Sequence, residues 1–340
     1  MKYKSFIINK TQAVERMNKW GKEKKPFLFI TSFNQKQNLV LDESMAQKAG
    51  IHFQIGAHNN STKTHTRSAD LPSSIIFEKQ VINKVEFSIA FDVVKKHLDF
   101  GNTYLINLTK PSKVKTNLSF SQIYHHSKAL YKLWIEDKLV VFSPEIFVKI
   151  KHGIISSFPM KGTIDAALAH AKEQILKDPK EIAEHHTIVD LIRNDLSMVS
   201  KNVRVKRFRY ISEVKTHEKT LLQVSSEIEG EVQAGFFQNL GDHFYSLLPA
   251  GSISGAPKTK TIEIIEEAEQ YERGFYTGIF GYFDGESLDS AVMIRFMEEQ
   301  DGQVIFKSGG GITTFSNCEK EYEELKDKVY VPITRNHTNP

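Results

Sequence analysis

The chain has 340 residues, 40% of them hydrophobic and 25% charged, with a formal net charge of +4 at pH 7. This balance is that of an ordinary globular protein with a sizeable core, and the mildly basic charge comes with no aromatic nucleic-acid motif that would indicate a nucleic-acid partner. The single cysteine, Cys318, excludes an internal disulfide and a CxxC metal site, and the lack of a signal-peptide run or of 18 consecutive apolar residues predicts a cytoplasmic protein without a membrane span.

The first part of the chain, to about residue 85, predicts short strands joined by polar loops. Compact apolar runs bounded by polar residues predict strands at 26–31 and 51–56, and the polar stretch at 59–70 predicts an exposed loop. Apolar residues at helical spacing predict a helix at 87–100. It ends at Gly101, a residue type that often follows a helix C-terminus.

The remaining elements are strands in runs, with separate helices between them. Strands are predicted at 103–108, 139–143, 146–151, 278–284, 289–296 and 303–309, and helices at 179–199 and 318–330. This order lacks the regular alternation of a doubly wound sheet, so it predicts an α+β fold with large, mostly antiparallel sheets. No Pro/Gly-rich linker divides the chain, and we therefore expect a single domain over residues 1–340.

The helix predicted from residue 179 carries a carboxylate on its apolar face. Asp178 is a good N-cap, and Glu184, Ile188 and Leu191 fall on one side of the helix, with Glu181 nearby. A carboxylate on an apolar face is costly unless a cation or a proton donor meets it. The alternative is a boundary glutamate that pairs with a lysine.

The last helix has a matching feature. Glu321 and Glu324 are three residues apart, and Lys328 follows four residues after Glu324. A solvated ion pair on a surface helix accounts for this pattern equally well. Two helices that each present an E-x-x-E pair nevertheless favour a site for a hard cation such as Mg²⁺, which binds carboxylate oxygens.

Two glycine-rich segments offer backbone N–H groups to an anion. Three glycines at 309–311 follow a predicted strand and can form either a carboxylate-binding turn or a plain tight turn. The segment PAGSISGAPK at 249–258 is not a Walker A motif, because the second glycine is followed by Ala-Pro-Lys. An anion at the N-terminus of the helix that follows remains compatible with it.

One lysine lies in an apolar setting. Lys161 sits between Met160 and Gly162 in the segment SFPMKGT, and a lysine in an apolar pocket can act as a nucleophile. Glu145, which follows an earlier strand, could be its acid or base companion. An ordinary surface lysine is the alternative.

Together these segments resemble the family of chorismate-utilising enzymes. The matching stretches occur in the family's order and span most of residues 100–330, whereas the first 85 residues resemble the family only loosely. The stretches are SPE (143–145), PMKGT (159–163), AEHHTIVDLIRND (183–195), PAGSISGAPK (249–258), YTGIFGY (276–282), SAVMIRF (290–296), GGGI (309–312) and EYEELKDK (321–328).

The resemblance implies a sandwich of two sheets with helices outside, in which a divergent part (1–85) precedes a chorismate-binding core (86–335). It also implies roles for the residues that match the family's motifs. Mg²⁺ would bind Glu184 and Glu324, supported by Glu181 and Glu321, and would hold the ring carboxylate of chorismate together with Gly309, Gly311 and Lys328. The enolpyruvyl carboxylate would bind Tyr276 and Arg295, the ring pocket would include Gly162 and Thr163, and Glu145 would be the general acid.

The implied reaction depends on Lys161. Members of the family that aminate chorismate at C4 typically have lysine at this position, where the others usually have alanine. The resemblance therefore implies formation of 4-amino-4-deoxychorismate for folate biosynthesis, with Lys161 attacking C2 and ammonia then attacking C4. Cys318 lacks a nucleophile elbow, so a glutamine amidotransferase subunit is the expected ammonia source. The alternatives are the amination that yields anthranilate, and a non-catalytic chorismate-binding homologue.

The chain departs from the family at two places near this chemistry. Leu105 stands where ammonia-using members commonly have glutamine and water-using members need lysine, so activation of water is not expected. Leu222 and Gln223 stand where the family often has His-Leu.

Overall fold

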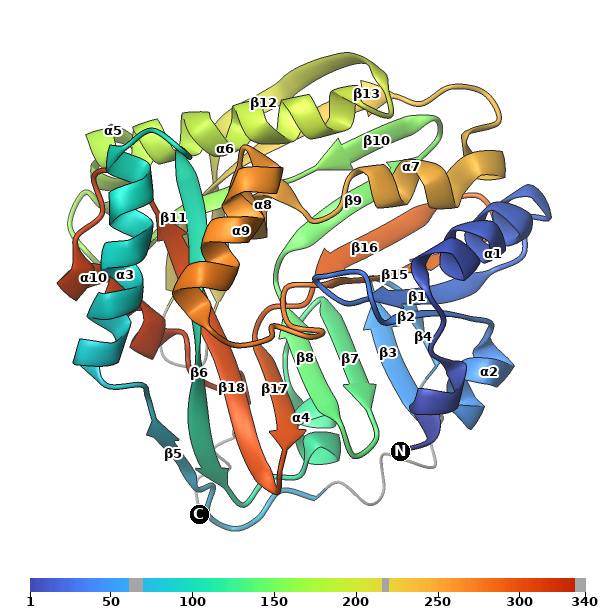
Figure 1. The fold of residues 1–340 in the computed structure, drawn as a ribbon, viewed down its shortest axis with the longest axis horizontal. Helices are drawn as coiled ribbons and strands as arrows, with labels where there is room; N and C mark the ends of the chain where they lie inside the picture. Colours follow the sequence, from blue (N-terminus) through green and yellow to red (C-terminus); the bar gives the residue numbers. More distant parts are fainter. Residues whose placement is uncertain (61–69, 216–219, 334–340) are drawn as a thin grey trace.

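Two large sheets form the framework of the computed structural model, which describes residues 1–60, 70–215 and 220–333 (Figure 1). Within these residues each sheet has nine strands, and every strand pairing is antiparallel. The prediction of an α+β fold with large, mostly antiparallel sheets is therefore confirmed.

The first sheet, sheet A, runs in the order β11-β13-β10-β9-β16-β15-β1-β2, with β12 paired to β13. It joins strands from the start, the middle and the end of the chain. Its strands are β1 (Phe27–Thr31), β2 (Asn38–Leu41), β9 (Ile146–Lys151), β10 (Ile154–Ser157), β11 (Met160–Asp165), β12 (Lys201–Lys215), β13 (Thr220–Glu231), β15 (Ile279–Phe283) and β16 (Leu288–Val292).

The second sheet, sheet B, runs in the order β14-β6-β18-β17-β8-β7-β3-β4, with β5 paired to β6. Its longest pairing joins β6 to β18. Its strands are β3 (Ile51–Ile55), β4 (His58–Asn59), β5 (Phe77–Gln80), β6 (Leu105–Thr116), β7 (Tyr131–Ile135), β8 (Leu139–Ser143), β14 (Gly255–Ala256), β17 (Phe296–Gln300) and β18 (Gln303–Ile312).

Strand β1 explains how sheet A can be buried on both faces. All five of its residues are buried, and successive side chains of a strand point to opposite faces. Leu28 and Ile30 enter a cluster that joins both sheets, whereas Phe27 and Phe29 enter a second cluster formed with helices. The two sheets therefore pack as a sandwich, with helices over the outer face of sheet A.

The helices cover the outer faces. Figure 1 shows α6 lying across β12 and β13 at the top of the molecule, and α3, α9 and α10 gathered beside β6 and β18. The helical elements are η1 (Lys2–Phe6), α1 (Lys10–Lys22), α2 (Glu43–Lys48), α3 (Lys84–Asp99), α4 (Phe120–His126), α5 (Ala171–Lys177), α6 (Pro179–Ser197), η3 (Phe236–Asn239), α7 (Leu240–Ser246), α8 (Gly251–Ser254), α9 (Lys258–Glu269) and α10 (Cys318–Asp327).

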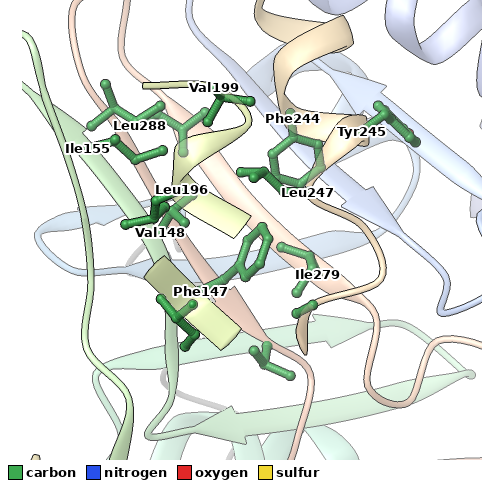
Figure 2. Packing of buried hydrophobic residues seen from close by; sticks show 14 of the residues in the cluster. Phe147, Val148, Ile155, Leu196, Val199, Phe244, Tyr245, Leu247, Ile279 and Leu288 are labelled. Atoms are coloured by element: carbon green, nitrogen blue, oxygen red, sulfur yellow. The ribbon is translucent and has the colours of Figure 1, made fainter. Parts of the chain in front are cut away.

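Aromatic side chains from both layers fill the helix-covered side of sheet A (Figure 2). Phe147 of β9 meets Phe244 of α7 edge-on, with ring centroids 5.8 Å apart, and Leu196 of α6 belongs to the same cluster. Each fully buried side chain of this size stabilises the fold by about 1.5–3 kcal/mol. This packing fixes α6 and the residues that it carries against the sheet.

One prediction for the first 85 residues needs correction. This part contains the helices α1 and α2 as well as strands. Helix α1 begins with a capping box formed by Asn9 and Gln12, and it buries the small or flexible residues Ala13, Met17 and Gly21. So weak an apolar stripe gives little helical periodicity, which is why the sequence did not reveal it. Most of the predicted loop at 59–70 lies outside the described residues.

The predicted strand at 289–296 is wrong, because it is two strands in different sheets. Strand β16 ends at Val292 in sheet A, and β17 begins at Phe296 in sheet B. Arg295, at the crossing, has a left-handed backbone with φ of +51°. A continuous apolar run concealed this break, since both strands are mostly buried. The division of the chain at residue 85 stays a prediction.

Among the described residues, no helix has both the length and the apolar character that would let it cross a membrane.

Candidate active site

The predicted site residues come from both sheets and gather where β11 and α6 approach β18 and α10. Lys161 Nζ lies 3.7 Å from Glu184 Oε2, and the carboxylate is almost fully buried. A Cβ added to Gly311 would lie 2.7 Å from Lys161 Nζ and 3.1 Å from Leu105 Cδ1. The amine of Lys161 therefore lies directly over Gly311, beside the apolar side chain of Leu105.

A bulge in β11 sets the position of this lysine. The register between β11 and β13 shifts between Met160 and Thr163, and Gly162 has φ of +80°. Such an irregularity redirects a side chain from its regular place on the sheet. A Cβ at Gly162 would lie 2.7 Å from Glu181 Oε2, so this glycine also makes room for the Glu181 carboxylate. The side chain of Thr163 lies outside the described part of the structure.

Helix α10 brings a second charged group to the same strand. A Cβ added to Gly310 would lie 3.5 Å from both Glu324 Oε1 and Lys328 Nζ, and 3.7 Å from Glu321 Oε2. Lys328 Nζ is 2.6 Å from Glu324 Oε1. Burial lowers the pKa of Lys328, although the Glu324 carboxylate opposes this shift. Neighbouring residues of a strand face opposite ways, so Gly310 and Gly311 face opposite sides of the sheet. Lys161 therefore lies on one side of the end of β18, and the Glu324–Lys328 pair lies on the other.

The three glycines belong to a strand, not to the turn that the sequence suggested. Strand β18 continues to Ile312 and pairs with β6 from Val304 to Ile312. On the other side, β17 pairs with β18 only as far as Lys307 among the described residues. Glycine is needed at Gly309 because a Cβ would collide with the carbonyl oxygen of Leu108. The end of β18 therefore presents an edge that β17 does not cover.

The N–H groups of two glycines point to this uncovered edge. Thr109, opposite Gly309, donates its N–H to Glu269 Oε1 at 2.8 Å, and the Gly309 carbonyl accepts from Lys328 Nζ at 2.7 Å. Gly309 and Thr109 therefore form a non-hydrogen-bonded pair, in which the N–H of Gly309 points away from β6. The alternation along the strand gives Gly311 the same direction. Both donors can reach an anion that lies between Lys161 and Lys328.

Glu145 lies in the turn between β8 and β9 and is partly buried. Ser252 of α8 donates a hydrogen bond to Glu145 Oε1 at 2.7 Å. Burial raises the pKa of Glu145, while the hydrogen bond from Ser252 and the charges of Lys161 and Lys328 oppose this shift. A carboxyl group with a raised pKa can remain protonated long enough to act as a general acid.

A small pocket, partly open to solvent, adjoins Glu145. Most of its lining is apolar and comes from β9, α6 and the segment that contains α8. The lining residues are Glu145, Ile146, Phe147, Val148, Ser157, Pro159, Ile192, Asp195, Leu196, Leu247, Ala250, Gly251 and Ser252.

Tyr276 and Arg295 lie on two interlocked segments. Thr277 N–H donates to the carbonyl of Met293 at 2.8 Å, and Met293 N–H donates to the carbonyl of Gly278 at 2.7 Å. Tyr276 is buried, and burial raises the pKa of its hydroxyl. Arg295 is partly exposed, and its Nε lies 3.3 Å from the hydroxyl of Tyr330. The predicted partners for the enolpyruvyl carboxylate are thus held by the same backbone contacts.

The four glutamates predicted as Mg²⁺ ligands lie on two helices, Glu181 and Glu184 on α6 and Glu321 and Glu324 on α10. Their donors are all oxygens, as Mg²⁺ prefers, and Gly162 and Gly310 leave space where side chains would meet three of the four carboxylates. Within the described ranges, no three His, Cys, Asp or Glu side chains lie close enough together to hold a metal ion. Glu184 and Glu324 are paired with Lys161 and Lys328. The oxygen donors suit Mg²⁺ by their chemistry, and the assignment of these ligands stays a prediction.

Sequence reasoning missed two supporting contacts. Ser252, the partner of Glu145, lies in the segment PAGSISGAPK, which was read only as an anion-binding loop. Lys258 of the same segment forms a 2.8 Å ion pair with Asp195, at the far end of the helix that carries Glu184. Both residues lie within the matching motifs, but their pairing is a long-range contact that spacing does not reveal.

Comparison with known proteins identifies the family of this chain. The family model described as chorismate binding enzyme matches residues 9–334. An uncharacterized PabA-like protein of Haemophilus influenzae is 47% identical over 320 residues, which cover 94% of this chain and 96% of that protein. Anthranilate synthase component 1 of Acetivibrio thermocellus is 34% identical over 267 residues, covering 73% and 52% of the two chains. Aminodeoxychorismate synthase component 1 of Bacillus subtilis is 32% identical over 262 residues, covering 72% and 52%.

Solved structures show the same fold at low sequence identity. MenF, the menaquinone-specific isochorismate synthase of Escherichia coli, aligns with a TM-score of 0.71 at 13% identity over 95% of this chain and 82% of that one. Anthranilate synthase component I of Streptococcus pneumoniae aligns with a TM-score of 0.63 at 22% identity over 87% and 69%. With the family model matching nearly the whole length, the chain belongs to the family of chorismate binding enzymes.

Proposed function

We propose that this enzyme converts chorismate and ammonia to 4-amino-4-deoxychorismate, a step toward 4-aminobenzoate and folate, with Mg²⁺ as its cofactor. The observation that carries the proposal is the position of Lys161, whose amine lies over Gly311 and 3.7 Å from Glu184. A nucleophile is thereby available beside the strand edge that would hold the ring carboxylate. Enzymes of the family that aminate C2 directly have no need of an amine at this place.

The proposed binding mode uses both flanks of β18. The N–H groups of Gly309 and Gly311, with Lys328, would hold the ring carboxylate, and Gly162 and Thr163 would line the ring. A bound Mg²⁺, held by Glu184 and Glu324 with Glu181 and Glu321 in support, would neutralise the same carboxylate. Tyr276 and Arg295 would bind the enolpyruvyl carboxylate, for which the planar guanidinium of arginine is well suited.

The proposed chemistry begins at Lys161. Its amine attacks C2 of chorismate, the two ring double bonds shift by one position, and the C4–O bond breaks. Glu145 donates its proton to the departing hydroxyl, which leaves as water. Ammonia then attacks C4, the double bonds shift back, the C2–N bond breaks and the lysine is released. The Glu145 carboxylate takes one proton from the new ammonium group, so the acid is restored and one ammonia has replaced one water.

Ammonia would come from a separate glutamine amidotransferase subunit. Cys318 is the first residue of α10, and burial raises the pKa of its thiol, which disfavours the thiolate that a glutaminase needs. The similarity to proteins described as PabA-like and as aminodeoxychorismate synthase component 1 supports this assignment. The cytoplasm stays the predicted compartment.

A second candidate is the amination that produces anthranilate. The 34% identity to an anthranilate synthase component 1, slightly above that to the aminodeoxychorismate synthase, favours it. On this alternative Lys161 would take no part in bond formation, which gives the two candidates different responses to one substitution.

Product identification distinguishes them. The purified chain is incubated with chorismate, Mg²⁺ and ammonium at alkaline pH, with and without an aminodeoxychorismate lyase, and products are identified by chromatography and mass spectrometry. We expect lyase-dependent 4-aminobenzoate from the wild type and none from Lys161→Ala, while Lys138→Ala, which alters another paired lysine, should retain activity. Anthranilate from both wild type and Lys161→Ala would refute the proposal.

A further inference from the structure

A buried arginine that the proposed chemistry does not use lies directly behind the site. Arg273 is only 3% exposed, and all five of its N–H donors are engaged. Two go to the carboxylate of Glu269, on the preceding helix α9. The contacts are Nε to Glu269 Oε2 (2.9 Å), Nη2 to Glu269 Oε1 (2.6 Å), Nη2 to the Asn107 carbonyl (2.6 Å), Nη1 to the Ile253 carbonyl (2.9 Å) and Nη1 to Thr277 Oγ1 (3.2 Å).

Two of the acceptors are neighbours of residues that shape the site. Ile253 follows Ser252, which donates to the general acid Glu145. Asn107 of β6 pairs with Gly311 of β18, over which the amine of Lys161 lies. The guanidinium of Arg273 therefore connects the segment that carries Ser252 with the paired strands β6 and β18, over which Lys161 lies.

The third acceptor controls Tyr276. Thr277 has φ of +59°, a left-handed conformation that is costly for a β-branched residue and persists only where its surroundings fix it. Its hydroxyl accepts from Arg273 and is also 2.7 Å from the Tyr276 carbonyl, and its N–H donates to the carbonyl of Met293. These contacts determine the direction in which the Tyr276 side chain leaves the backbone.

Glu269 completes the arrangement from the opposite side. It is 3% exposed, and its Oε1 also accepts from the N–H and the hydroxyl of Thr109, in the same strand β6. Lysine cannot replace Arg273 here, because a single ammonium group cannot reach acceptors spread over so many segments.

We propose that Arg273, held by Glu269, is a positioning residue that keeps Tyr276, the Ser252–Glu145 pair and the Gly311 edge in one fixed arrangement. The inference rests on the proposed site, but not on which amine product forms. It gives the Arg273–Glu269 pair a function beyond stability: loss of the guanidinium displaces groups that contact chorismate.

The test uses Arg273→Lys and the isosteric Thr277→Val in the full chain. Since misplacement by about 1 Å costs on the order of 100-fold, we expect kcat/KM for chorismate to fall about 100-fold in Arg273→Lys. Thr277→Val should raise KM roughly 10-fold with little change in kcat, because it disturbs a group that binds ground state and transition state alike. Weakening of the Ser252 contact should also move the alkaline limb of the pH profile of Arg273→Lys to higher pH.

The matched control is Arg204→Lys, at an exposed arginine that pairs with Glu229 at 2.6 Å across β12 and β13. Thermal melts establish that each variant is folded at the assay temperature, and Thr277→Val decides the matter if Arg273→Lys does not fold. Activity is measured as chorismate consumed, so a different product would overturn the proposed function alone. If the wild type consumes no chorismate, the affinity of the same variants for chorismate is measured by calorimetry and compared instead. Folded variants that match the control in kcat/KM, pH profile or binding would overturn the inference.

Discussion

Gly311→Ala is the substitution whose effect follows most directly from the geometry of the site. The added methyl carbon would lie 2.7 Å from Lys161 Nζ, about 0.7 Å inside the 3.4 Å at which ordinary contacts begin, and 3.1 Å from Leu105 Cδ1. Lys161 has a flexible side chain, so its amine moves aside while the strand stays in place. We therefore expect a nearly unchanged fold and a misplaced nucleophile.

The magnitude follows from that displacement. A misplacement of about 1 Å costs on the order of 100-fold in rate, so a shift of somewhat less should lower kcat for amination between about 10- and 100-fold. Lys138→Ala is the control, because this lysine pairs with Glu298, outside the candidate site. Steady-state assays with chorismate and ammonium, beside thermal melts, measure both effects. Equal kcat values for the two variants would refute the assigned position of Lys161.

Two further substitutions test the general acid and the core. Ser252→Ala removes a hydrogen bond that lowers the pKa of Glu145, so this pKa should rise. Because the protonated carboxyl is the active form of a general acid, the alkaline limb of the kcat/KM profile should move to higher pH. A move to lower pH would contradict the proposed role of Glu145 as general acid. Phe244→Ala, which removes a buried ring 4.8 Å from that of Phe29, should lower the free energy of unfolding by about 3–5 kcal/mol in urea titrations. Substitution of the exposed Phe100 by alanine should change the free energy of unfolding by less than about 0.5 kcal/mol. Equal losses in the two variants would show that Phe244 does not pack against Phe29.

The sequence predicted the elements of the site better than their arrangement. The N-cap at Asp178 and the helical periodicity that follows placed Glu184 on a buried face, where the structure has it at 8% exposure. On the last helix Glu321 and Glu324, three residues apart, face the same place, since a Cβ at Gly310 would lie 3.7 and 3.5 Å from their carboxylates. Their burial differs: Glu321 is buried, whereas the side chain of Glu324 is 53% exposed.

Other features could not follow from local pattern. The triple glycine suggested a turn because glycine weakens strands. It stays in a strand because a side chain at Gly309 would collide with Leu108 and one at Gly311 would meet Lys161. Those neighbours are supplied by strands more than a hundred residues away in the chain. Motif resemblance named these glycines as part of the site, but only the pairing of β6 with β18 explains their direction.

Two of the candidate site residues lie where regular structure is interrupted, and at Arg295 the fold holds the interruption in place from other segments. Lys161 precedes a glycine at a bulge of β11, and Arg295 has a left-handed backbone at the crossing between the sheets. A left-handed backbone at a residue other than glycine, such as Arg295, costs of order 1–3 kcal/mol and needs surroundings that fix it. At Arg295 the carbonyl accepts from Phe142 N–H, and the preceding Met293 is locked to Gly278. Distant segments therefore hold Arg295 in a conformation that its local sequence does not favour, as is expected where a fold gives up stability for a functional site.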